Sequence, residues 1–408
     1  MKDPPAPSVA EYKPVPAAGT VLVPAGPACY CIGLVHREKR ESQMARNAFR
    51  QALELAETGI KERQQHNQSI VSFEFNMARC VGLGIGWIAY NEASLSEAAA
   101  ALVMARHLLR PAKAKLISAY LDVVQATIMM SESTEPTNIL KAIEILGAGY
   151  SKFAPSGKPR HTHYALRCQN ELALAYLRLA LACKDDSQQF QENLRHAENY
   201  VAKVKETARP ILKAELRSYC TALITEARIK RARDKPDEAL ALAEEAKREG
   251  AGIELIRVDA LIAVGEAELA RQVYNKSISA FLEALERGRE NRKDAAVCHL
   301  HLCRAYLLDN QLAKAKEYFA RWESMKGGIG NAFITDMALT VEKMLAHSFK
   351  NFELTKEDIE RDGDHSKYLD SLRRWLAHTA LALNNGDIKA AGRWLKVHSA
   401  TVAEWLDL

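Results

Sequence analysis

Features that define several other protein classes are missing from this sequence of 408 residues. No stretch reaches the run of about 18 unbroken apolar residues that a membrane-spanning helix needs. The start of the sequence, from Met1 to Pro5, lacks the basic end and the apolar run of a secretion signal. We therefore expect no membrane partner and a cytoplasmic location, with a nuclear location as the alternative.

Sequence signs of catalysis are missing as well. We find no HExxH motif. We also find no nucleophile with a nearby base, and no pair of acidic residues on one helix face, in a context that would support catalysis. Catalytic groups need not be neighbours in sequence, but nothing here favours a reaction. We predict that the protein is not an enzyme and uses no cofactor.

Residues that break helices are scarce and unevenly placed. The chain has 20 Gly and 13 Pro, and seven of the prolines fall within residues 1–27. Residues 1–40 are therefore predicted to form a Pro-rich disordered or extended arm. The arm either packs on the first helix or lies as a strap in a groove of its own chain. The remaining sequence is rich in Ala, Leu, Glu, Lys and Arg, which favour helices.

The eight cysteines are scattered, and several stand at predicted core positions of helices. Buried, reduced thiols are favoured over a disulfide framework. The formal charge of +5, from 56 Lys and Arg against 51 Asp and Glu, permits an anionic partner without requiring one.

The most regular pattern lies between residues 258 and 322, where two predicted helical hairpins follow each other. Their large and small residues follow the order W-x2-L-G-x2-Y…A-x3-F. The second hairpin carries the pattern at His299, Leu302, Cys303, Tyr306, Ala315 and Phe319, and the first at Leu261, Val264, Gly265, Ser277 and Phe281. Small residues late in one helix and early in the next let two antiparallel helices approach closely, while aromatic rings fill the wedge to the next hairpin.

This pattern resembles the tetratricopeptide-repeat superfamily. The resemblance implies an all-α fold: a right-handed superhelix of TPR-like hairpins (an α-solenoid), here with about eight hairpins. The small residues recur at a spacing of 38, or twice 38 at the last step, rather than the family's usual spacing of about 34. They are Ala227, Gly265, Cys303 and Thr379, followed twelve positions later by Ala239, Ser277, Ala315 and Ala391. The divergent repeat between them covers Phe333 to about Ile359.

A break divides the helical part of the sequence. Two prolines and a glycine lie within residues 154–160, which excludes a helix there. We predict N-terminal helical hairpins over residues 41–153, beginning with an amphipathic helix from Glu41 to about Gln65, and a C-terminal TPR-like array over residues 162–408. The tail from Ala400 to Leu408 is predicted to be either a capping helix or a contact.

Two motifs have both a functional and a structural interpretation. Gly82, Gly84 and Gly86 could suggest a phosphate loop, but they stand inside a helix-like run, which favours close helix packing. His161, His163 and Cys168 are possible metal ligands, but no second pair follows at zinc-site spacing. An exposed turn opening a helix is the better interpretation, and we predict no metal.

The densest charge cluster is the basic run from Arg228 to Lys235. In the repeat register, Arg228 and Arg231 fall at positions that line the concave groove, as do Leu300, Arg304 and Leu307. The run is either a solvated face or a surface for an acidic peptide. It has no interleaved aromatics for stacking on bases. The Lys and Asn pattern with which some repeat proteins clamp a chaperone's C-terminal carboxylate is missing at the matching positions.

These observations predict a non-enzymatic scaffold or adaptor that binds a peptide segment of a partner protein in its concave groove, as a subunit of a complex. The groove contacts are predicted to be Arg228, Arg231, Leu300, Arg304 and Leu307. The alternative is a nucleic-acid-associated or ligand-sensing regulatory repeat protein.

Overall fold

The structure, a computed structural model, describes residues 25–39, 41–66, 77, 79–92, 94–109, 115–154, 158–349, 373–374, 376–381, 384, 387–395 and 397–406. The chain divides into two compact units. Unit 1 comprises residues 1–298 and 325–333, and unit 2 comprises residues 299–324 and 334–408.

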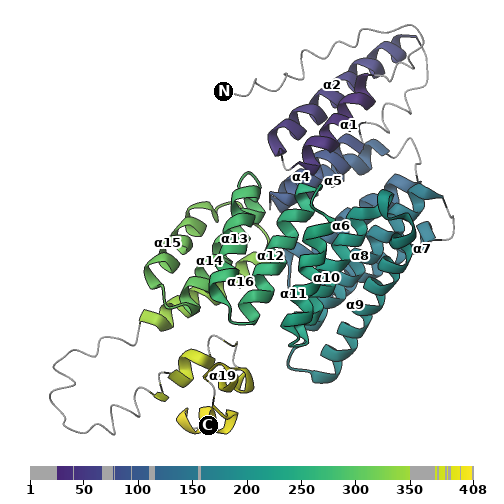
Figure 1. Cartoon of the computed structure of the whole chain (residues 1–408). Helices are drawn as coiled ribbons and strands as arrows, with labels where there is room; N and C mark the ends of the chain where they lie inside the picture. The colour runs from purple at the N-terminus through teal and green to yellow at the C-terminus, as the bar shows by residue number, and fades with distance from the viewer. Residues whose placement is uncertain are drawn as a thin grey trace, which may run out of the picture. The chain divides into compact units, whose positions relative to one another are not determined.

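Helices joined by turns make up unit 1, and no strand occurs among the described residues of the chain (Figure 1). The helices are α1 (Ala25–Glu38), α2 (Ser42–Gln65), α4 (Gly86–Asn91), α5 (Leu95–Leu109), α6 (Lys115–Glu132), α7 (Pro136–Phe153), α8 (Pro159–Ala182), α9 (Ser187–Ala208), α10 (Leu212–Ala232), α11 (Pro236–Glu249), α12 (Glu254–Ala270) and α13 (Tyr274–Gly288). A π-helical turn (Arg79–Ile85) precedes α4, and a 3-10 turn (Arg209–Ile211) precedes α10.

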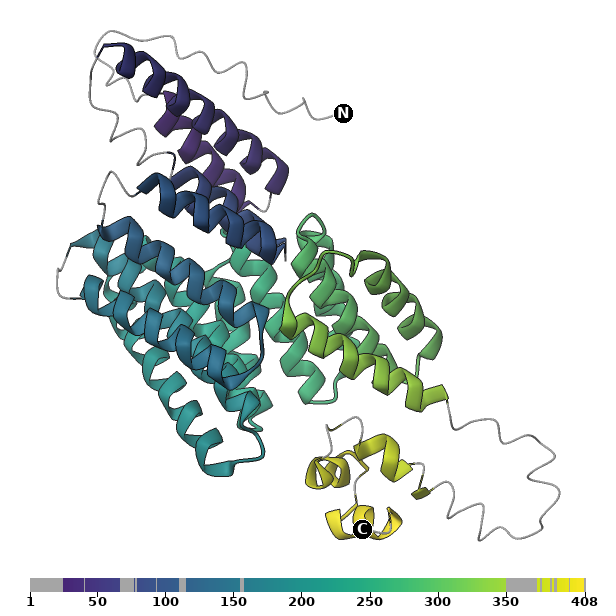
Figure 2. The ribbon, with the colours of Figure 1, turned by 180° about the vertical axis from the view of Figure 1, so that it is seen from behind.

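The packing order is that of a stack of hairpins. Each helix from α5 to α12 packs against the next one in the chain. The first helices of successive hairpins, α6, α8, α10 and α12, also pack against one another in turn. Figures 1 and 2 show these helices side by side in chain order. The predicted all-α array of TPR-like hairpins is thereby confirmed, and the handedness of the superhelix stays a prediction.

The hairpin of α12 and α13 shows why the small residues recur. A Cβ atom at Gly265 would lie 2.6 Å from the ring of Phe281, which is fully buried. The Ser277 hydroxyl donates a hydrogen bond of 2.8 Å to the carbonyl of Gly265. Position 265 is therefore restricted to glycine by the neighbouring helix, and the predicted register is confirmed.

The register also holds in the neighbouring hairpins. Helices α11, α13 and α15 (Leu312–Met325) begin 38 residues apart, at Pro236, Tyr274 and Leu312. The early small residues Ala239 and Ala315 are buried, like Ser277. The interval of 38 is therefore the length of one hairpin in this part of the chain.

The glycines of the predicted packing motif lie in the π-helical turn and at the start of α4. A Cβ atom at Gly82 would collide with the side chains of Leu121 and Ala105, and one at Gly84 would lie 2.8 Å from the ring of Phe49. Close helix packing, the favoured interpretation of these glycines, is confirmed.

Two predicted boundaries differ in the structure. Residues 25–38 form α1 instead of belonging to an extended arm, because Pro27 falls in the first turn, where a missing amide hydrogen costs little. The rest of the predicted arm, residues 1–24, lies outside the described residues. The break at residues 154–160 turns the chain from α7 to α8, and one hydrophobic core containing Phe153 and Leu172 crosses it. The division into units occurs instead at Cys298.

Helix α14 (Arg292–Leu308) begins in unit 1 and ends in unit 2. Unit 2 continues with α15, α16 (Ala332–Phe349), α19 (Ile388–Leu395) and α20 (Ser399–Trp405). Helix α20 lies in the tail, for which a capping helix and a contact were the two predicted alternatives, and both roles stay predictions. Helix α16 covers the first part of the divergent repeat, and its acidic continuation, residues 355–364, lies outside the described residues. No helix in the described part of the chain combines the length and apolar character needed to span a membrane.

All eight cysteines are free thiols, and six of them are buried. Burial raises the pKa of Cys168, Cys220 and Cys303 to about 12, which keeps these thiols protonated near neutral pH. The expectation of reduced, buried thiols is confirmed.

Replacing Gly265 by alanine should lower the free energy of unfolding by about 1–3 kcal/mol, because the new methyl group meets the Phe281 ring. Gly147 in α7 is the matched control, since a Cβ atom there would meet no atom within 4 Å. Gly147→Ala should raise stability by about 0.5–1 kcal/mol through helix propensity. Urea unfolding of both variants measures the two changes. A Gly265→Ala variant as stable as the parent would contradict the register.

Acidification should destabilise unit 2 through His299. Burial, with the nearby positive charge of Arg321, lowers the pKa of His299 from its usual 6.5 to about 4. Between these values the unfolded chain binds the proton and the folded chain does not, so stability is lost as the pH falls through this window.

The melting temperature should fall less between pH 7 and pH 5 in His299→Gln than in the parent. An equal fall in both would refute this assignment.

Candidate functional site

One face of α10 carries the side chains on which a functional site can be built. Arg217, Thr221, Ile224, Arg228 and Arg231 follow each other at intervals of four, three, four and three residues, which places them on one side of a helix. We call this face the α10 stripe. Its two ends are arginine, while Thr221 is half-buried and Ile224 is buried.

At the C-terminal end of the stripe two arginines share one carboxylate. The Nε atom of Arg228 and a terminal nitrogen of Arg231 each lie 3.5 Å from the same oxygen of Glu266 on α12. The Glu266 side chain is only 7 % exposed, whereas those of Arg228 and Arg231 are 29 % and 32 % exposed. The group therefore combines two positive charges and one buried negative charge, and its positive side reaches the surface.

The remaining cations of the basic run point to other neighbours. Lys230 and Lys235 both pair with Glu238 on α11. Arg233 forms two hydrogen bonds of 2.8 Å with Glu198 on α9 and a further one with Gln191. Successive residues of a helix point about 100° apart. The cations of the basic run therefore pair with three different acidic residues, which are Glu266, Glu238 and Glu198. The run does not form the single basic stripe that binding to a phosphate backbone would favour.

The other predicted contacts belong to unit 2. Leu300 is fully buried, so in this structure it packs in the interior and offers no surface to a partner. Arg304 and Leu307 are half-buried. The pattern that placed Leu300 in the groove marks only the side of a helix, and neighbouring helices decide whether that side is covered.

The possible metal ligands of the sequence lie on α8 without coming together. His163 contacts both oxygens of Glu215, at 3.1 and 3.2 Å, and Cys168 is buried in the core. Ser218 donates a hydrogen bond of 2.7 Å to Glu215. Burial acts to raise the pKa of Glu215, but these hydrogen bonds and the charge of His163 outweigh it and lower the pKa. In the described part of the chain, no three His, Cys, Asp or Glu side chains form a group suited to a metal ion.

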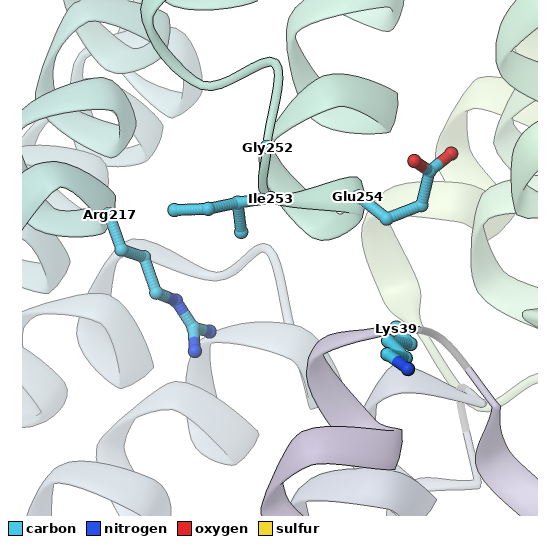
Figure 3. A pocket seen from close by; sticks show the side chains of 5 residues that line it. All are labelled: Lys39, Arg217, Gly252, Ile253 and Glu254. Carbon is cyan, nitrogen blue, oxygen red and sulfur yellow. The ribbon is translucent and has the colours of Figure 1, made fainter.

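A cavity of about 460 Å³ lies beside the N-terminal end of the α10 stripe. It is lined by Arg217, by Lys39 just after α1, and by Gly252, Ile253 and Glu254 where α12 begins. Figure 3 shows Arg217 and Lys39 coming to it from different elements. The sequence analysis missed Arg217, although its position eleven residues before Arg228 puts it on the same helix face. No sequence signal connects Lys39 with it.

No family model matches the sequence, and no curated protein matches it. Solved structures with a similar course of the chain include a Rap protein complexed with competence and sporulation factor, at 12 % identity and a TM-score of 0.49, with 94 % of this chain and 99 % of that one covered. A signal-transduction ATPase with a tetratricopeptide-repeat sensor from Pyrococcus horikoshii has 18 % identity and a TM-score of 0.45, with 89 % and 53 % covered. The human IFIT1 dimer with m7Gppp-AAAA has 16 % identity and a TM-score of 0.39, with 95 % and 94 % covered.

Glu266→Gln should destabilise the protein by about 1–3 kcal/mol, because it leaves two guanidinium groups together without their buried counter-charge. The control is Glu317→Gln, which removes the partner of Arg321 from a surface pair whose side chains are 54 % and 50 % exposed. That change should alter stability by less than about 1 kcal/mol. Thermal unfolding at low ionic strength compares the two. Equal effects would show that Glu266 does not hold the arginines.

Proposed function

We propose that this chain binds a segment of a partner protein along the α10 stripe, and that Arg228 and Arg231 hold an acidic group of that segment. The observation that carries the proposal is the shared carboxylate of Glu266. Each guanidinium has five N–H donors, and one carboxylate cannot satisfy both groups. Among the described residues, neither arginine has another ion-pair partner. A carboxylate from a partner supplies the missing acceptors and balances the second positive charge.

The partly buried position of the two arginines strengthens such a contact. About two-thirds of each side chain is already covered by the protein, as the exposures of 29 % and 32 % show. Their side chains therefore lose less freedom on binding than fully exposed ones, and bound water is displaced from a small area. The predicted contacts Arg304 and Leu307 in unit 2 stay part of the proposal as further places where a partner binds, and Leu300 is left out because it is buried.

The alternative is that the chain binds nucleic acid. The pairing of Lys230, Lys235 and Arg233 with acidic side chains argues against it, since these cations are already compensated. The two functions differ in their response to salt. Phosphate binding falls steeply with salt concentration, whereas a contact with apolar parts is less sensitive.

The double variant Arg228→Gln/Arg231→Gln should lose the partner, because glutamine removes both positive charges but can still donate a hydrogen bond to Glu266. The full chain serves as bait in an extract of its native cells, with washes at low and high salt, and mass spectrometry quantifies what is retained. Retention of the partner should fall at least tenfold in the double variant.

Arg248→Gln is the matched control, because the side chain of Arg248 is 71 % exposed on α11 and, among the described residues, forms an ion pair only with the neighbouring Glu249. It should retain the partner like the parent. Equal retention by all three proteins would contradict the proposed contact. Nucleic acid that is retained at low salt and lost at high salt, with no protein, would favour the alternative.

A further inference from the structure

Three charged residues occupy the same position on the first helices of successive hairpins. Arg178 on α8, Arg228 on α10 and Glu266 on α12 each stand four residues before the last residue of their helix. These helices pack against one another in turn, and charged atoms of Arg228 and Glu266 lie 3.5 Å apart. Equivalent positions of neighbouring repeats lie side by side. Arg178 therefore extends the row of Arg228 and Glu266 by one hairpin, and we call these three residues the charged row.

The positive charge of Arg178 has no acidic partner among the described residues. One of its terminal nitrogens donates a hydrogen bond of 2.7 Å to the backbone carbonyl of Met130 near the end of α6, which is a neutral group. A guanidinium has five N–H donors, so this bond leaves most of them for a ligand. The one acidic residue of α8, Glu171, comes seven residues earlier, at about 10 Å along the helix axis. Arg178 is half-buried, so water screens its charge less than that of an exposed arginine.

An exposed aromatic ring lies beside Arg178. Phe333 belongs to the first turn of α16, and its side chain is 42 % exposed. The centre of its ring lies 5.8 Å from the guanidinium carbon of Arg178, near the outer limit of about 6 Å for a cation–π contact. Both residues belong to unit 1. The first position of the charged row thus offers a positive charge and an apolar surface next to each other.

The distance between the helices sets the spacing of the groups that the charged row can hold. The axes of packed helices lie about 8–10 Å apart, so Arg178 and Arg228 are separated by about this distance. A peptide in a β-strand conformation presents every second residue on one side, about 6.6 Å apart. A polyproline II peptide presents every third residue on one side, about 9.3 Å apart, and this spacing matches the helices.

We infer that the partner segment carries a second acidic residue, three positions from the one at Arg228 and Arg231, and that Arg178 holds it. The apolar residue next to this second acidic residue packs on Phe333. The segment thus continues from the C-terminal end of the α10 stripe onto α8. The inference rests on the proposed function and adds the second anchor, the spacing and the polyproline II conformation.

Synthetic peptides with blocked termini test the spacing by isothermal titration calorimetry with the full chain at low salt. The first peptide is Leu-Asp-Pro-Pro-Asp-Leu, whose aspartates are three positions apart and whose prolines favour polyproline II. The second, Asp-Leu-Pro-Pro-Leu-Asp, has the same composition with its aspartates five positions apart. The third, Leu-Asp-Pro-Pro-Asn-Leu, has one aspartate. The parent should bind the first at least about fivefold more tightly than either of the others, as one added charge-assisted pair predicts.

Single variants assign the second anchor. Arg178→Gln can still donate a hydrogen bond to the Met130 carbonyl, but it should bind the first peptide no better than the third. Its affinity for the third peptide, held at Arg228 and Arg231, should stay within about twofold of the parent value. Phe333→Ala should bind the first peptide at least about threefold more weakly than the parent does, because it removes apolar contact area. Arg248→Gln on α11 should behave like the parent with all three peptides, and circular dichroism melting curves show whether each variant is folded at the titration temperature.

The outcomes separate the inference from the proposed function. A parent that binds the first and second peptides equally, or an Arg178→Gln variant that keeps the preference for the first over the third, overturns the inference and leaves the proposed function standing. Unchanged affinity of Phe333→Ala for the first peptide overturns the contact with the ring. Unchanged affinity of Arg228→Gln/Arg231→Gln for the first peptide overturns the proposed function. A parent that binds none of the peptides overturns both.

Discussion

The close approach of two antiparallel helices at a small residue is the constraint on which the rest of this structure depends. At Gly265 the ring of Phe281 fills the space that a side chain would occupy, and Ser277 ties the two helices by a hydrogen bond to the same residue. This contact fixes how α12 and α13 are rotated against each other, because Gly265 lets the Phe281 ring approach α12 at this position. The faces of these two helices that lie outside the contact are therefore fixed as well.

The repeat also places charged side chains at equivalent positions of successive hairpins. Arg228 and Glu266 stand 38 residues apart, at the same position of successive hairpins, and α10 packs against α12. Equivalent positions of neighbouring repeats come close together in such arrays, so opposite charges placed there meet. Arg304 continues the same register with a further change of sign. The arginine pair is thus a consequence of the repeat, with Arg231 added one helical turn after Arg228.

The pattern of large and small residues made the fold predictable from the sequence. The residues of the candidate site could be predicted only in part. The small residues Ala227, Gly265 and Cys303 predict helix pairs and their spacing because overlap of atoms is decided by size alone. Whether a side chain on the right face is also accessible depends on several helices at once, which is why Leu300 was misplaced as a surface residue. Glu266 could have been recognised as the partner of Arg228 from the register. The meeting of Lys39 with Arg217 could not, because 178 residues separate them and no repeat relates α1 to α10.

The burial of its shared carboxylate distinguishes the Glu266 group from the other ion pairs among the described residues of unit 1. Asp122 is also shared, by Arg106 and Lys152, but its side chain is 24 % exposed, against 7 % for Glu266. Among the described residues, Glu198 forms an ion pair with Arg233 alone, and Arg271 contacts both Asp237 and Glu268, so each of these cations has a counter-charge. Glu238 is shared by Lys230 and Lys235, but its side chain is 49 % exposed. Water therefore hydrates the positive charge that this one carboxylate does not balance.

Glu266 is also shared, yet it is buried, and water cannot reach it in the same way. The positive charge left over at Arg228 and Arg231 is then only partly screened, on a surface already covered for two-thirds of its area. A structural role alone would be served by one arginine facing one glutamate. In the function we propose, the second arginine pairs with an acidic group of the partner.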